Sequence, residues 1–251
     1  MAATIISILN LKGGVGKTTT TINLGKALSL KKKKVLLVDS DPQANLTEGL
    51  GISQPEKTLF DAYKLAIPTP IVKINKYLHV VPSELNLATI EHEIEGNINR
   101  YYLLKDALKD EAENYDYILI DCPPSIGVYT INGITTSTHY LITAQAARYS
   151  ITGLNSIKDL IDNKIRQRLN PEIKPLGILI TGLTKTIAAD ISIEEIQEDY
   201  AEELFKSKIR HTTKFVESQL AGEDIFTYAP NSKGAADYEN VAKEVIKKLK
   251  E

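Results

Sequence analysis

A glycine-rich loop near the N-terminus constrains this chain more than any other feature. Residues 4–10 form an apolar run of strand length, and a helix-length segment, residues 16–30, begins where the loop ends. A strand, a glycine-rich turn and the start of a helix form a cradle for an anion, because backbone N–H groups and the positive end of the helix dipole converge there. This order predicts a phosphate-binding loop.

The loop itself reads Leu-Lys-Gly-Gly-Val-Gly-Lys-Thr-Thr over residues 11–19. Its glycines allow backbone N–H groups to approach an anion that a side chain would block. Lys17 is placed to reach the β- and γ-phosphates of a nucleotide, and the Thr18 hydroxyl is placed to ligate Mg²⁺. A glycine-rich turn with a surface lysine is the alternative. The expected cradle comprises Gly13, Gly14, Val15, Gly16, Lys17 and Thr18.

The loop departs from the common phosphate-loop motif in one respect. That motif has a glycine five residues before Gly16, whereas this chain has Leu11 there. An additional lysine, Lys12, stands beside the loop and points away from the helix that follows. Its side chain is free to contact the phosphates of a nucleotide held by a second subunit.

Apolar strand-length runs alternate with helix-length segments along the whole chain. Strands are expected at residues 4–10, 34–39, 78–82, 117–121, 139–144, 176–183 and 208–210. Helices are expected at residues 16–30, 100–112, 127–136, 151–168, 192–206 and 233–250. Continuous apolar strands are typical of parallel sheets covered on both faces. We predict an α/β fold with a doubly wound, mostly parallel sheet flanked by helices, in a single domain, residues 1–251.

Three aspartates end or follow predicted strands at the edge where such sheets bind ligands. Asp39 and Asp41 lie where the second strand ends. Two carboxylates beside triphosphate oxygens require a cation or a water between them. Asp121 ends a buried strand, a position from which a carboxylate faces Mg²⁺. For Asp39 and Asp41, an Asx-type turn that leaves the strand is the alternative.

These segments together resemble the motifs of the ParA/MinD family of dimerising ATPases. Residues 12–19 resemble its deviant Walker A motif. The Asp-Ser-Asp-Pro-Gln run, residues 39–43, resembles switch I, and Cys-Pro-Pro-Ser, residues 122–125, resembles switch II. The resemblance covers essentially the whole chain. It implies a P-loop ATPase fold, ATP and Mg²⁺ as cofactors, and a homodimer in the ATP state.

The resemblance also implies roles for individual residues. Lys12 would reach across a nucleotide sandwich to the second subunit, and Thr19 would contact a phosphate. Asp41 would support hydrolysis, while Asp39 and Asp121 would act on the Mg²⁺, Asp121 through a bound water. The implied catalytic residues are Lys12, Lys17 and Asp41, and the implied metal residues are Thr18, Asp39 and Asp121. By family position, the adenine contacts lie in residues 181–184 and near residues 209–210.

Composition narrows the class of ATPase. The 30 basic and 32 acidic residues give a net charge of −2, which makes no global electrostatic case for a polyanionic partner. The single Cys122 is too few for an iron–sulfur cluster, and we expect it to be a buried apolar residue. The guanine-reading Asn-Lys-x-Asp motif is absent, which favours ATP over GTP. No apolar run approaches the ~20 residues of a membrane span, so we expect a cytoplasmic protein.

The C-terminal third of the chain contains the residues that suggest which partner the protein binds. Residues 208–217 align by pattern with a segment of partition ATPases, and Lys214 falls where that family often has a DNA-contacting arginine. The final helix has an apolar stripe that predicts packing against the sheet, and lysines beside it. The lysine run at residues 31–34 is interpreted as a solvated helix end. The candidate DNA-binding residues are Arg210, Lys214, Lys243 and Lys247.

We therefore expect a ParA-like ATPase that binds DNA nonspecifically in its ATP state. A ParB-type partner would stimulate hydrolysis, and the cycle would drive plasmid or chromosome segregation on the nucleoid. The near-neutral charge fits binding that requires the basic patches of two subunits together. The alternative is a MinD-like ATPase that positions cargo at a membrane or on a protein cluster, and a metabolic or metal-carrier ATPase is a third possibility. We expect no role at a membrane, because the sequence shows no appended amphipathic segment of the kind that a reversible membrane anchor requires.

Overall fold

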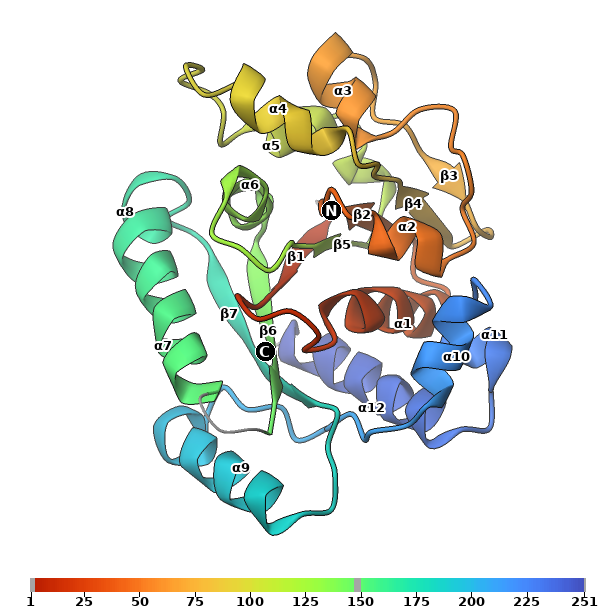
Figure 1. The fold of residues 1–251 in the computed structure, drawn as a ribbon, viewed down its shortest axis with the longest axis vertical. Helices are drawn as coiled ribbons and strands as arrows, with labels where there is room; N and C mark the ends of the chain where they lie inside the picture. The colour runs from red at the N-terminus through yellow and green to blue at the C-terminus, as the bar shows by residue number, and fades with distance from the viewer. Residues whose placement is uncertain (1–2, 147–149, 251) are drawn as a thin grey trace.

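A seven-stranded sheet forms the centre of the structure, a computed structural model that describes residues 3–146 and 150–250 (Figure 1). The strand order is β3-β4-β2-β5-β1-β6-β7, and every pair is parallel except β3 with β4. The predicted doubly wound, mostly parallel sheet is confirmed. The strands are β1 (Thr4–Leu9), β2 (Val35–Asp39), β3 (Val72–Lys73), β4 (Leu78–Val81), β5 (Tyr117–Asp121), β6 (His139–Gln145) and β7 (Lys174–Thr181).

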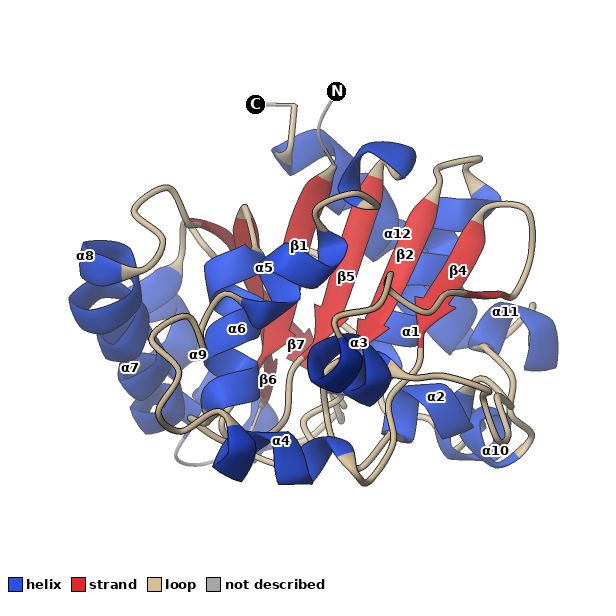
Figure 2. Cartoon of the chain, turned by 90° about the horizontal axis from the view of Figure 1, so that it is seen from above, coloured by secondary structure: helices blue, strands red, loops and turns tan. Residues whose placement is uncertain are grey.

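Helices cover both faces of this sheet (Figures 1 and 2). One face packs against α1 (Lys17–Leu30), α2 (Asn45–Gly49), α10 (Lys214–Leu220), α11 (Ile225–Tyr228) and α12 (Lys233–Lys248). The other packs against α3 (Leu59–Leu65), α4 (Leu87–Glu93), α5 (Leu103–Leu108), α6 (Val128–Thr136), α7 (Ser150–Leu160) and α9 (Ile187–Tyr200). The short α8 (Arg166–Arg168) follows a π-helical turn, Ile161–Ile165. The two apolar layers bury most of the central strands β2, β5 and β6, which explains their continuous apolar runs.

The final helix packs as its apolar stripe predicts. Val241 and Val245 are fully buried, and the hydroxyl groups of Tyr238 and Thr20 are 3.0 Å apart. The contact joins α12 to the first turns of α1, directly behind the phosphate loop. The Ser232 side chain accepts a hydrogen bond from the backbone N–H of Ala235 and so fixes the start of α12. Helix α12 therefore packs against the start of α1, which directly follows the phosphate loop.

One predicted strand is wrong, and several boundaries move. Residues 208–210 do not form a strand. A single isolated bridge, between Leu183 and Arg210, joins this segment to the chain that follows β7. The helix expected at 192–206 is α9, which starts earlier because Thr186 caps it by accepting a hydrogen bond from Ala189. The π-helical turn interrupts the helix expected at 151–168, and that expected at 100–112 shortens to α5.

The shortest elements were not predicted from the sequence. They are β3, α2, α3, α4, α10 and α11, none longer than seven residues. So few residues cannot display a helical or strand period, and tertiary contacts determine their conformation. Within the described ranges, no helix is both long and apolar enough to cross a bilayer.

Candidate active site

The glycine-rich loop adopts the backbone conformation that its glycines were expected to provide. Gly14 has φ +73° and Gly16 has φ +80°, in the left-handed region that side chains rarely adopt. A Cβ atom on Gly13 would meet nothing within 4 Å, so the backbone there is open to a ligand. Helix α1 begins at Lys17, immediately after the loop. The strand, loop and helix predicted from the sequence are all present.

Side chains from the neighbouring strands hold the loop in place. Thr181, at the end of β7, donates its hydroxyl hydrogen bond to the Val15 carbonyl at 2.8 Å. The side-chain amide of Gln145, at the end of β6, donates to the Gly14 carbonyl at 2.9 Å. The sequence analysis assigned no such role to either residue, because sequence spacing does not reveal which strand ends adjoin β1.

The two lysines of the loop differ in their surroundings. Lys17 is buried, and its Nζ donates to the Lys12 carbonyl at 3.2 Å. Burial lowers the pKa of Lys17, an effect that Asp121 and Asp41 oppose. Lys12 is exposed, and its side chain forms no hydrogen bond or ion pair within the described residues. Lys17 is therefore fixed inside the site, whereas Lys12 extends outward.

Asp121 lies buried beside the first turn of α1. The Thr18 hydroxyl donates to its Oδ2 at 2.6 Å, and the Thr21 hydroxyl donates to its Oδ1 at 3.3 Å. Burial, together with the nearby Asp39 carboxylate, raises the pKa of Asp121 to about 8. A cation at this point would stabilise the ionised carboxylate. One hydroxyl and one carboxylate fit Mg²⁺, which retains waters and shares phosphate oxygens rather than filling a protein cage.

Asp39 is also buried, but hydrogen bonds occupy both of its carboxylate oxygens. Its Oδ2 accepts from the Thr47 backbone and hydroxyl at 2.9 and 2.7 Å, and its Oδ1 accepts from the Asp41 N–H at 3.3 Å. Burial raises the pKa of Asp39 to about 6. These contacts fix helix α2 against the end of β2. The role of Asp39 at the metal remains a prediction.

Asp41 faces the hollow in front of the loop. Its Oδ1 accepts from the Gln43 N–H at 2.9 Å, and its carbonyl accepts from the Ser83 hydroxyl at 2.9 Å. Its Oδ2 makes no hydrogen bond within the described residues. The carboxylate is thus held from one side with one oxygen available, the arrangement that orientation of a water requires.

The hollow itself has a volume of about 750 Å³ and lies between the phosphate loop, switch I and α10. This volume is in the range of small-molecule sites. Gln219 of α10 lines it, and its side-chain amide donates to the Thr19 hydroxyl at 3.1 Å. The sequence analysis missed Gln219, since α10 itself was not predicted. Pro124 of switch II completes the opposite wall.

Comparison with known proteins agrees with this geometry. A sequence profile described as an AAA domain matches residues 3–175. The chain is 39% identical over 249 residues to the sporulation initiation inhibitor protein Soj of Bacillus subtilis, covering 96% of this chain and 97% of Soj. It is 37% identical to the chromosome partitioning protein ParA of Myxococcus xanthus, covering 97% and 88%. The chain belongs to the ParA/MinD family of ATPases.

Solved structures of ParA/MinD-type proteins superpose over nearly the whole chain. Cobyrinic acid a,c-diamide synthase from Mycobacterium smegmatis, with bound ADP and magnesium, gives a TM-score of 0.86 at 28% identity, covering 99% of this chain and 96% of that one. McdA from Cyanothece in complex with ATP gives 0.86 at 25%, covering 99% and 97%. The cell division ATPase MinD from Pyrococcus furiosus gives 0.82 at 25%, covering 98% and 99%. These proteins have different tasks, so the fold does not select the output.

Two segments expected at the adenine do lie side by side in this ParA/MinD-type fold. The Leu183 N–H donates to the Ile209 carbonyl at 2.9 Å, and the His211 N–H donates to the Leu183 carbonyl at 2.9 Å. Their contact with a base remains a prediction. Cys122 is buried against Gly133, as expected for a small apolar residue.

Among the candidate DNA-binding residues, Arg210, Lys214 and Lys243 are paired with carboxylates of the same chain. Arg210 donates to Asp237 through Nη2 at 2.6 Å and through Nε at 3.0 Å. Lys214 contacts Glu217 at 2.6 Å. Lys243 contacts Glu239 at 2.8 Å, and Lys247 lies one turn further along α12. Arg210 thus helps to hold α12, while the lysines lie on exposed helix surfaces.

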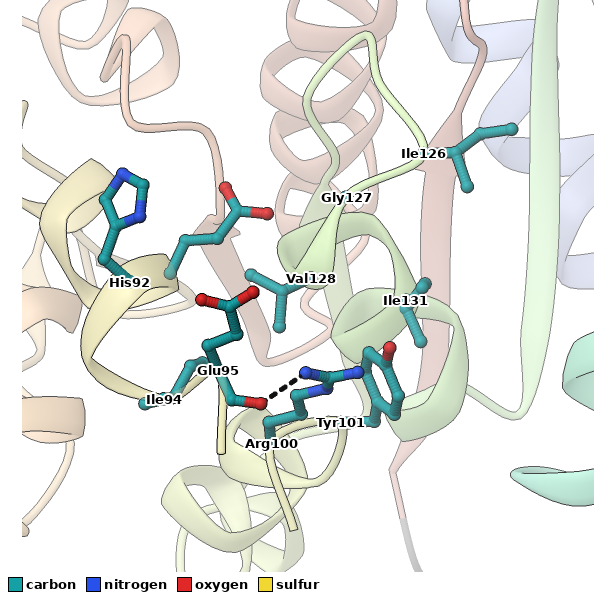
Figure 3. Close-up of a pocket in the computed structure, with 10 residues that line it drawn as sticks. His92, Ile94, Glu95, Arg100, Tyr101, Ile126, Gly127, Val128 and Ile131 are labelled. Atoms are coloured by element: carbon teal, nitrogen blue, oxygen red, sulfur yellow. Dashed lines mark hydrogen bonds between the residues drawn. The ribbon is translucent and has the colours of Figure 1, made fainter. Parts of the chain in front are cut away.

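A second, smaller hollow of about 370 Å³ lies between the start of α6 and the segment after α4 (Figure 3). Ile126 and Val128 line it from the end of the loop before α6 and from the start of α6, and Glu95 and Arg100 line it from the segment after α4. The Arg100 guanidinium donates to the Glu95 carbonyl at 2.6 Å. No residue of the phosphate loop lines it, so this hollow is separate from the nucleotide hollow.

Proposed function

We propose that this single-domain protein is a partition ATPase that hydrolyses ATP with Mg²⁺, dimerises with ATP bound, and binds DNA nonspecifically in that state. A ParB-type partner would stimulate hydrolysis and drive segregation of a plasmid or chromosome. The observation that carries the proposal is that Lys17, Thr18 and Asp41 line one hollow. Buried Asp121 accepts a hydrogen bond from Thr18 behind it, and Lys12 is exposed beside it. The names of its Soj and ParA relatives support the same task.

The phosphate loop would bind the triphosphate through its backbone N–H groups and Lys17. Desolvation of Lys17 makes its charge more effective, because water does not screen it there. Thr18 and Asp121 would hold Mg²⁺, which when bound neutralises charge on the transferred phosphoryl group. The Thr18 hydroxyl, which donates to Asp121, would then turn its oxygen toward the cation. Gln219 would keep Thr19 oriented by donating to its hydroxyl oxygen.

Asp41 would orient the attacking water. Its Oδ1 is held by Gln43, so its Oδ2 has a fixed position from which to accept a hydrogen bond from water. Positioning of this kind lowers the barrier without covalent chemistry by the protein. Because Ser83 also holds the Asp41 carbonyl, a movement of this loop would change the rate of hydrolysis.

Apolar side chains around the nucleotide hollow support a dimer closed over it. Val216 and Leu220 of α10 line the hollow and are 60% and 86% exposed. Ile126, which directly follows switch II, is 50% exposed. A second subunit would cover these side chains and allow Lys12 to reach the partner's phosphates.

Lys214 would contribute to DNA binding from the surface of α10, with Lys243 and Lys247 on α12 and Arg210 beside them. Glu217 neutralises Lys214, and the Tyr228 hydroxyl donates to the same carboxylate at 3.0 Å. DNA phosphates would have to displace Glu217 from Lys214. Weak binding by one subunit would follow, consistent with a cytoplasmic protein that associates with the nucleoid only as an ATP-bound dimer.

One assay tests the proposed function. The protein with ATP and Mg²⁺, or with ADP, is offered random-sequence DNA and phosphatidylglycerol vesicles in parallel. We expect binding to DNA with ATP alone and no binding to vesicles. Binding to vesicles alone would instead indicate a MinD-like ATPase, and binding to neither would contradict partition on DNA.

A further inference from the structure

A cluster of lysines at the amino ends of β2 and β4 has no part in the proposed nucleotide cycle. Four consecutive lysines, residues 31–34, connect α1 to β2, and Lys73 and Lys76 belong to the β3–β4 hairpin. Figure 2 shows this connection and the hairpin turn at the same end of the sheet, away from the arrowheads of β2 and β4. We call this surface the amino-end patch; it comprises Lys32, Lys34, Lys73 and Lys76.

Pairing between β2 and β4 brings the patch together. The Val35 N–H donates to the Tyr77 carbonyl at 2.8 Å, so Lys34 lies beside the hairpin turn. Lys73 stands opposite His79 in the antiparallel ladder. A hollow of about 670 Å³ opens between these segments. Its charged and titratable residues are Lys34, Lys73, Lys76, His79, the tyrosines 77 and 115, and a single carboxylate, Glu111.

The lysines of the patch are exposed, and the ammonium group of Lys76 lies 5.2 Å from the centre of the Tyr77 ring. None of its four lysines forms an ion pair within residues 3–146 and 150–250. Its neighbours differ, since Lys33 lies 3.6 Å from Asp116 and Lys31 lies 3.9 Å from Glu239. Burial, together with Lys73 and Lys34, lowers the pKa of His79. Two carboxylates adjoin these four lysines: Glu111 lines the hollow, and Asp116 accepts a hydrogen bond from the Lys34 N–H at 2.8 Å. Because neither forms an ion pair with a lysine of the patch in the described residues, the patch keeps an excess of positive charge.

We propose that the amino-end patch is a second DNA-binding surface that contacts the phosphodiester backbone without reading the sequence. The inference rests on the proposed function. Lysine ammonium groups are compact point charges on flexible stems, which suit phosphate contacts of no fixed geometry. No carboxylate must be displaced from them, in contrast to Lys214. Release of counterions from the DNA would supply the binding free energy.

The position of the patch separates it from the nucleotide. Strand β2 spans Val35–Asp39, with the patch before its first residue and switch I after its last. At about 3.3 Å per residue, the first and last residues of the strand are about 13 Å apart. A dimer closed over the nucleotides would therefore leave the patch of each subunit uncovered and directed outward.

The test uses the full chain with Lys34→Gln, Lys73→Gln and Lys76→Gln combined. Binding of a short random-sequence duplex to the ATP-bound protein is measured by fluorescence anisotropy between about 50 and 200 mM salt. We expect the triple variant to lose about tenfold or more in affinity, and its log–log salt slope to fall by about 2 to 3, one contact per lysine. Basal ATP hydrolysis should be unchanged and serves as a measure of folding.

The matched control replaces three other exposed lysines that form no ion pair with any residue the structure describes, Lys57→Gln, Lys105→Gln and Lys164→Gln, and alters the net charge equally. Equal losses in both triple variants would overturn the inference, since net charge would then be the cause. So would unchanged affinity and slope in the patch variant. Selective loss of binding to phosphatidylglycerol vesicles would assign the patch to a membrane. If the unmodified protein bound no DNA with ATP, the proposed function would fail as well.

Discussion

At the carboxyl ends of the strands, Lys17, Asp39 and Asp121 are buried, and each is held by hydrogen bonds from the fold. At the amino ends, Lys34 and Lys73 are exposed and form no ion pair within the described residues. Fixed charges at one end suit a single ligand geometry, as phosphoryl transfer requires. Mobile charges at the other end suit a polyanion of any sequence. We therefore propose that the carboxyl ends of the strands serve ATP hydrolysis and that the amino ends of the same strands bind DNA.

The largest expected effect comes from Asp41→Ala at the carboxyl end. Loss of the carboxylate that orients water should lower single-turnover ATP hydrolysis about 10²- to 10³-fold. ATP binding and DNA binding should persist, because the amino-end patch is untouched. Phosphate release measures the first effect and anisotropy the second. The control variant Glu48→Ala removes another carboxylate at the same hollow and should leave the rate of ATP hydrolysis nearly unchanged. If the Asp41→Ala variant hydrolyses ATP as fast as the unmodified protein, Asp41 does not orient the attacking water.

Lys17→Ala should reduce ATP affinity by at least about 100-fold, since charge-assisted hydrogen bonds to two phosphates are lost. Titration with a fluorescent ATP analogue measures this loss. If ATP affinity stays as in the unmodified protein, the assigned nucleotide site is wrong. ATP-dependent DNA binding should disappear with it, whereas any DNA binding that remains without nucleotide should depend on the amino-end patch.

Lys12→Ala tests whether an exposed lysine can also act on the nucleotide, because Lys12 is exposed but lies at the carboxyl ends of the strands. We expect the ATP-dependent dimer to weaken about tenfold or more, the value of a charge-assisted contact, while ATP binding to the monomer stays largely intact. Light scattering with ATP and with ADP measures the dimer. Normal dimerisation of the variant would remove the cross-subunit role.

The smallest effect is expected from Glu217→Gln. The change frees Lys214 from its carboxylate and should raise DNA affinity about two- to fivefold, because one more phosphate contact forms without competition. Asp162→Asn is the matched control, since Asp162 also pairs with a cation, Arg166, on an exposed helix surface. Equal affinity in the unmodified protein and both variants would place DNA binding at the amino end alone.

The longer elements followed from the sequence, although the bounds of some, such as α9, were displaced by several residues. The parallel strands and α1, α6 and α12 were predicted within a few residues. Short elements such as α10 were not, because seven residues of mixed polarity carry no clear stripe and contacts with α2 and α11 fix them. The predicted strand near Arg210 failed for a related reason, since one bridge suffices to hold that segment.

The sequence by itself determined the phosphate loop, because its chemistry depends on consecutive backbone groups and on glycines whose conformation is local. It also placed Asp41 and Asp121 at strand ends. Only the tertiary structure decided that Gln219 contacts Thr19, 200 residues away, and that Lys34 joins Lys73 in one patch. Such contacts depend on the order of strands in the sheet and on which helix covers which face. The pattern of each segment encodes its own backbone period, not the identity of its neighbours.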